Sequence, residues 1–70
     1  MSRYLIVVEK AGANYSAYAP DMPGCVATGA TRDEVEANMV EAIRMHLDGL
    51  REDGLVVPPA QAFAEVVAIA

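Results

Sequence analysis

Residues 31–50 read TRDEVEANMVEAIRMHLDGL and carry a clear helical periodicity. Apolar side chains, with one histidine among them, recur three and four positions apart, as on one face of an α-helix: Val35, Met39, Ala42, Ile43, His46, Leu47 and Leu50. Thr31 is a good N-cap, and Glu34 three residues later completes a capping box. Gly54 and the following Pro58-Pro59 stop the pattern. The sequence predicts a helix from about residue 32 to about residue 52.

Short β-type segments stand on both sides of this helix. Residues 4–8, 15–19 and 25–28 precede it, and residues 63–69 follow it. Turn residues at positions 10–14 predict a hairpin loop of about four to five residues between the first two segments. The order β-β-β-α-β predicts an α+β fold, an antiparallel hairpin sheet with one long helix packed on one face.

One helix can cover only one face of such a sheet. Residues 4–8 and 63–69 are nonetheless apolar on both alternating sides, so an apolar sheet face is expected to need another partner. A core in 70 residues supplies little stability, and the single cysteine, Cys25, cannot form an internal disulfide. We therefore expect self-association, as a homodimer or a tetramer.

The charge balance narrows the range of partners. Ten acidic and five basic residues give a net charge of −5, which argues against direct nucleic-acid binding, because phosphate contacts depend on Lys and Arg. The same charge favours a basic protein partner. No apolar run approaches the roughly 20 residues of a membrane span, and no signal peptide is evident. We expect a single cytoplasmic domain over residues 1–70 with no membrane contact.

A family resemblance emerges from the segment after the hairpin. Residues 18–25 read YAPDMPGC and are followed by Gly29, Thr31 and the helix. This pattern resembles the HicB family, the antitoxin half of HicA–HicB toxin–antitoxin pairs. The resemblance implies a partial ribonuclease-H-like fold that binds and masks HicA, a small basic ribonuclease that acts on mRNA. Many members carry a C-terminal DNA-binding domain, and none is expected in a sequence that stops at Ala70.

The same segment supplies the candidate partner-binding residues. They are Tyr18, Pro20, Asp21, Met22, Pro23, Gly24 and Cys25. Met22, between two prolines, is expected to present a compact apolar tip, and tyrosines are common at interfaces. The alternative explanation is structural: a rigid turn that links two strands. Cys25 and His46 are interpreted as packed side chains, without a catalytic or metal-binding role.

Catalysis is not expected, and no catalytic, cofactor-binding or metal-binding residue is predicted. Two-metal hydrolysis needs several carboxylates that converge on the ions, whereas the centre of the first strand is Ile6-Val7. The sequence therefore predicts an antitoxin that is not an enzyme. Two alternatives stay open: an orphan adaptor domain without a toxin, and a degenerate ribonuclease-H-like nuclease.

Overall fold

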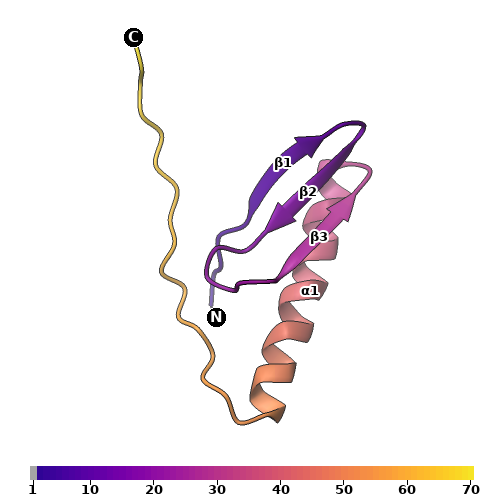
Figure 1. Ribbon diagram of the computed structural model, residues 1–70, viewed down its shortest axis with the longest axis vertical. Coiled ribbons are helices and arrows are strands. Elements are labelled where there is room, and N and C mark those ends of the chain that lie inside the picture. The colour runs from indigo at the N-terminus through magenta and orange to yellow at the C-terminus, as the bar shows by residue number, and fades with distance from the viewer. Residues whose placement is uncertain (1) are drawn as a thin grey trace.

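The computed structural model describes residues 2–70, which form three strands and one helix (Figure 1). The elements are β1 (Val7–Ala11), β2 (Asn14–Tyr18), β3 (Val26–Gly29) and α1 (Arg32–Glu52). The strands form one antiparallel sheet in the order β1-β2-β3, and α1 packs along one face of it (Figure 1). The predicted α+β class, with one long helix on one sheet face, is confirmed.

The β1–β2 hairpin is tighter than the sequence predicted. Ala11 pairs with Asn14, so the turn consists of Gly12 and Ala13 alone. Gly12 has a φ of 63°, a left-handed conformation that glycine adopts without steric penalty. The predicted loop over residues 10–14 was therefore too long. Strand pairing also begins later than predicted, at Val7 and not at Tyr4. The partner of Val7 is Tyr18, the last residue of β2, so the residues before Val7 have no strand residue opposite them.

The helix begins where its capping residues predict. The Glu34 backbone N–H donates to Thr31 Oγ1 at 3.1 Å, and Glu34 Oε1 accepts a hydrogen bond from the Ala30 N–H at 3.1 Å. The glutamate thus reaches one residue before the N-cap and not to the N-cap itself. The bond to Thr31 satisfies a backbone donor that the first helical turn leaves free, and the bond to Glu34 fixes the residue just before the N-cap.

The helix also ends where predicted, in a Schellman motif. Gly54 has a φ of 67°, and its N–H donates to the Arg51 carbonyl at 3.1 Å. The Leu55 N–H donates to the Leu50 carbonyl at 2.8 Å. This pair of bonds around a left-handed glycine is a common helix terminator.

Small residues on the sheet let the helix approach closely. Ala17 on β2 and Ala27 on β3 pack into the core facing the helix. At the end of β3, a Cβ added to Gly29 would lie only 2.6 Å from the Val35 backbone nitrogen. The sequence at position 29 is therefore restricted to glycine by the helix start that crosses it.

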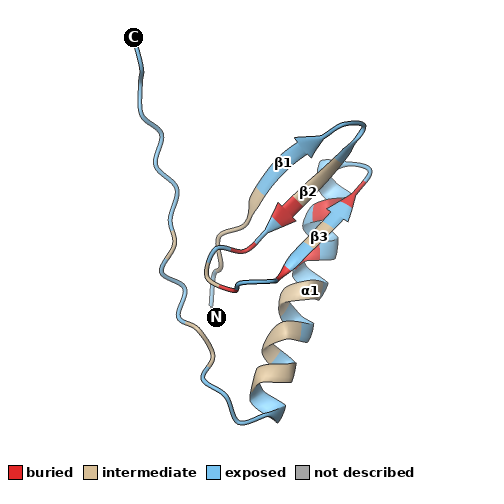
Figure 2. Ribbon diagram, in the orientation of Figure 1, coloured by how far each residue is buried: buried red, intermediate tan, exposed pale blue. Residues whose placement is uncertain are grey.

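The buried core is small and lies under the first half of the helix (Figure 2). It consists of Ala17, Ala19, Met22, Cys25, Val35 and Met39. The remaining predicted face of α1, from Ala42 to Leu50, is only half-buried. This part of the helix extends beyond the sheet (Figure 1), so an apolar side of the helix has no strand beside it.

The predicted fourth strand at residues 63–69 is not formed. The chain beyond Gly54 has no helix or strand, and residues 63–70 are all exposed (Figure 2). The prediction of a strand here was wrong, because apolar alternation does not supply the neighbouring strand with which the backbone must pair. In Figure 1 the segment runs away from the sheet toward the C-terminus.

The close approach at Gly29 generates the first testable prediction. Gly29→Ala should lower the free energy of unfolding by about 1–3 kcal/mol, because the added methyl overpacks a backbone contact. Gly49→Ala is the matched control: Gly49 lies in α1, and a Cβ there meets nothing within 4 Å. This control should gain about 0.5–1 kcal/mol from helix propensity. Urea denaturation measures both, and a fully stable Gly29→Ala variant would contradict the packing described.

The N-cap gives the second prediction. Thr31→Ala removes the oxygen that accepts the Glu34 N–H and should lower stability by about 1 kcal/mol. Thr31→Ser keeps the oxygen and should melt close to the unmodified protein. Equal melting temperatures for the alanine and serine variants would mean that the cap contributes nothing.

Candidate partner-binding surface

The connection between β2 and β3 folds back into the core. Its turns are closed by three backbone hydrogen bonds: Ala19 N–H to Cys25 O at 3.2 Å, Met22 N–H to Ala19 O at 3.0 Å and Cys25 N–H to Met22 O at 3.0 Å. Gly24 supplies the left-handed residue, with a φ of 84°. These bonds fix the backbone so that Ala19, Met22 and Cys25, three positions apart, lie in the core.

Met22 does not form an exposed tip, and that expectation is wrong. Its side chain is fully buried, and Cys25 is 5% exposed. Both belong to the core together with Val35 and Met39 of the helix. A methionine fills an irregular gap under a turn readily, because its side chain is long and unbranched. Pro20, Pro23 and Gly24 are the loop residues that stay exposed.

The free thiol of Cys25 is a packed group. Burial raises the pKa of the Cys25 thiol. A raised pKa lowers the fraction of the nucleophilic thiolate at neutral pH. The local environment therefore disfavours reactivity at this cysteine, in line with its interpretation as a packed side chain.

Asp21 holds the segment that follows the helix. Its carboxylate accepts hydrogen bonds from the backbone N–H groups of Gln61, at 3.2 Å, and Ala62, at 3.1 Å. A second tether lies nearby, where the Tyr4 hydroxyl donates to the Pro58 carbonyl at 2.7 Å. Sequence reasoning missed both contacts, because they join positions 40 or more residues apart.

An apolar row crosses the sheet face that the helix leaves uncovered. Tyr18 in β2 pairs with Val7 in β1 on one side and Val26 in β3 on the other. Tyr18 is 43% exposed and Val26 64%. We call these three residues the outer apolar row. The β2–β3 loop follows Tyr18 directly, so the exposed loop residues and the row lie side by side.

The next row on the same face is polar. It consists of Glu9, Ser16 and Thr28, which are paired across the three strands. The apolar surface is therefore confined to the end of the sheet that carries the β2–β3 loop. A compact apolar area with a polar border is typical of a protein–protein contact.

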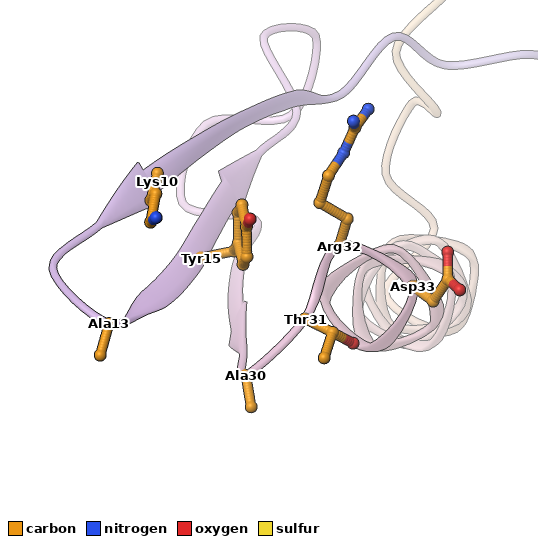
Figure 3. A pocket seen from close by; sticks show the side chains of 7 residues that line it. All are labelled: Lys10, Ala13, Tyr15, Ala30, Thr31, Arg32 and Asp33. Atoms are coloured by element: carbon orange, nitrogen blue, oxygen red, sulfur yellow. The ribbon is translucent and has the colours of Figure 1, made fainter.

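A shallow depression lies at the opposite end of the sheet (Figure 3). It has a volume of about 450 Å³ and lies between the β1–β2 turn and the start of α1. Lys10, Tyr15 and Arg32 supply its larger side chains, whereas Asp33 points to the other side of the helix start in Figure 3. Within residues 2–70 there is no group of three or more His, Cys, Asp or Glu placed to hold a metal ion.

Comparison of the sequence with known proteins places this chain in a family. The sequence model of the family described as "HicB_like antitoxin of bacterial toxin-antitoxin system" matches residues 4–69. The chain belongs to this family of HicB-like antitoxins. The resemblance read from the YAPDMPGC segment and the helix start is confirmed.

Two relatives are similar over much of the chain. An "Uncharacterized 14.9 kDa protein in rep-hol intergenic region" of Haemophilus phage HP1 is 34% identical over 64 residues, or 91% of this chain. This chain covers 48% of that phage protein, about half its length. A "UPF0150 protein" of Helicobacter pylori is 39% identical over 49 residues, 70% of this chain and 68% of the relative. No solved structure matches significantly. Among residues 2–70, α1 is too polar to cross a membrane.

The Asp21 tether gives the third prediction. Asp21→Ala should make the Gln61 and Ala62 amides exchange with solvent about tenfold faster or more, because a charged acceptor is lost from both. The Val35 amide, within α1, should exchange as before and serves as the internal control. Hydrogen exchange followed by NMR measures all three. Unchanged exchange at both tethered amides would show that the carboxylate does not hold this segment.

Proposed function

We propose that this domain is the antitoxin of a type II toxin–antitoxin pair and that it binds and masks a small basic HicA-type toxin that cleaves mRNA. The observation that carries the proposal is the family match, which spans residues 4–69. The family indicates a regulatory protein and not a catalyst. Its inhibition would be steric, through occupation of the surface that the toxin uses to bind RNA.

The outer apolar row and the adjoining loop are the proposed toxin-binding surface. Tyr18, Pro20 and Pro23 contribute exposed side chains; Asp21 lies between the two prolines, and Gly24 follows Pro23. Met22 and Cys25 would act indirectly, because they are buried and fix the shape of the loop. Tyrosine at the centre of an apolar row resembles the aromatic anchors that dominate many interfaces.

Charge supports a basic partner. The chain carries a net charge of −5, and Glu41 and Asp48 of α1 form ion pairs with Arg44 and Arg51. These ion pairs, at 3.2 and 3.5 Å, are solvent-exposed and contribute little to stability. Long-range attraction would mainly accelerate association with a cationic toxin, and salt would screen it.

Self-association forms a second part of the proposal. A domain with a six-residue buried core gains stability from a second copy, because small cores alone provide little. We therefore propose that the domain works as a homodimer or a tetramer. The large apolar side chains that remain exposed, among them Phe63, Val67 and Ile69, support this.

The fourth prediction tests the toxin-binding surface in cells. Co-expression of this chain with a basic protein encoded next to it should restore growth that the basic protein alone arrests. Tyr18→Asp should abolish the rescue, because it places an unpaired charge in a buried contact. The matched control is Met45→Asp, the same type of change at a side chain that is 72% exposed on the helix.

Both variants must first be shown to fold, by melting temperatures close to that of the unmodified chain. Rescue by Met45→Asp together with loss of rescue by Tyr18→Asp is the expected result. Equal rescue by both would place the toxin elsewhere on the domain. No rescue by the unmodified chain would contradict the antitoxin proposal and leave an adaptor domain as the better explanation.

A further inference from the structure

The eight residues after the Asp21 tether form an unpaired arm. We call residues 63–70 the C-terminal arm. Phe63 is 76% exposed, Val67 74% and Ile69 86%, and every other residue of the arm is exposed too. The arm is extended and leaves the body of the domain (Figures 1 and 2). Such a large exposed apolar segment has a strong tendency to find a partner.

The domain also has a groove lined mainly by apolar side chains, between the chain segment that leads into β1 and the helix α1. Its first part, of about 340 Å³, is lined by Tyr4 and Ile6, which precede β1, by Val8 of β1, and by Met39, Val40 and Ile43 of the helix. Glu36 is the one charged residue at this part of the groove. The second, lower part, toward the C-terminal end of α1, has a volume of about 540 Å³. Tyr4, Val40 and Ile43 line both parts, and the lower part continues to Leu47 and Val57. We call the two parts together the β1–α1 groove.

The groove exists because the helix is off-centre on the sheet. α1 packs mainly on β3 and least on β1. The close approach at Gly29 holds the helix start against the end of β3. The space between β1 and the helix is consequently left open, and Val8 and Val40 remain 37% and 44% exposed there.

The backbone beside this groove is an open sheet edge. β1 is at the end of the strand order β1-β2-β3, so one side of it pairs with no strand within residues 2–70. An open edge is a template for the addition of another strand. An arm of eight residues extends about 26 Å at the usual rise per residue, which is enough to span the five residues of β1.

The arm has the side-chain pattern that this position requires. Phe63, Val67 and Ile69 share one side of an extended arm, and Ala64, Val66 and Ala68 lie on the other. The larger set would enter the groove if the arm were paired with β1. The arm's one charged side chain, Glu65, is on the same side, and Arg44 and Arg51 line the lower part of the groove.

We propose that two copies of this chain exchange their C-terminal arms, each arm pairing with the β1 edge of the other copy and filling its β1–α1 groove. A second copy is the occupant because the chain's own arm is directed elsewhere. Asp21 holds residues 61 and 62, and Tyr4 holds Pro58. From these tethers the arm runs away from its own sheet (Figure 1).

Each copy then supplies one arm and one groove, so a twofold axis closes the assembly without leaving either unpaired. The exchange gives a structural basis for the self-association proposed above and rests on it, but it does not depend on any toxin. The fourth strand missing from the single chain would be provided in the dimer by the partner.

Alternating substitutions in the arm test the exchange. The mass of the unmodified chain, measured by light scattering across micromolar concentrations, should correspond to a dimer or a tetramer of 7.4 kDa subunits. Val67→Asp should weaken association by about a hundredfold, because it buries a charge in the groove. Val66→Asp, the control at a residue that is 96% exposed, should associate normally, since its side chain faces away from the groove.

Mixing two defective variants distinguishes exchange from other contacts. Val67→Asp has a damaged arm and an intact groove, and Val40→Asp has the reverse. Each alone should be monomeric, whereas a mixture should form heterodimers with one intact arm–groove pair. Heterodimers in the mixture would support exchange.

Three results would overturn the exchange. A monomeric unmodified chain would remove both the exchange and the proposed self-association, without bearing on toxin neutralisation. Association that tolerates Val67→Asp but is lost in Tyr18→Asp would move the contact to the outer apolar row. Variants that remain monomeric when mixed would show that arm and groove do not meet in different copies.

Discussion

The packing of one helix against small residues of the sheet is the contact on which the rest of the domain depends. Ala17, Ala27 and Gly29 are small residues on the helix-facing side of β2 and β3 and let the helix approach closely, so Val35 and Met39 reach full burial. Gly29 sets the limit, because its missing side chain is where the helix backbone passes. The remaining core residues, Met22 and Cys25 among them, fill the space below this contact.

The position of the helix has consequences at the edges of the molecule. A helix held over β3 leaves the β1 edge and its groove open, and a helix of 21 residues on strands of four or five extends beyond them. The sheet face opposite the helix keeps the outer apolar row exposed. Two separate apolar surfaces thus arise from one packing constraint. We assign the outer row to the toxin and the groove to a second copy of the chain.

Local signals in the sequence predicted the helix best. Thr31, Glu34 and Gly54 act within four residues of the positions they cap, so both ends of the helix were foreseeable. The family resemblance could also be recognised from local sequence, because the residues that carry it lie close together along the chain, from Tyr18 to the helix start. The hairpin was predicted as a unit, but its turn was placed too broadly, because the polar Lys10 and Asn14 read as loop although the ladder includes them.

Non-local features were not foreseeable from the pattern. Nothing adjacent to Met22 shows that the loop turns its side chain inward, and nothing near Asp21 shows that it holds amides 40 residues further along. The exposed row was anticipated as a general property of a sheet with one helix, and Tyr18 was among the candidates; the register then identified its neighbours. The segment at residues 63–69 has the alternation of a strand, but periodicity does not specify which chain provides the pairing edge.

The antitoxin role is the central claim, and inhibition of the toxin by purified components tests it most directly. The purified chain would be titrated into RNA cleavage by the basic protein encoded beside it, at fixed ionic strength. The account predicts that cleavage falls to background as the chain reaches stoichiometric amounts. Cleavage that continues unchanged with the chain in large excess would contradict it.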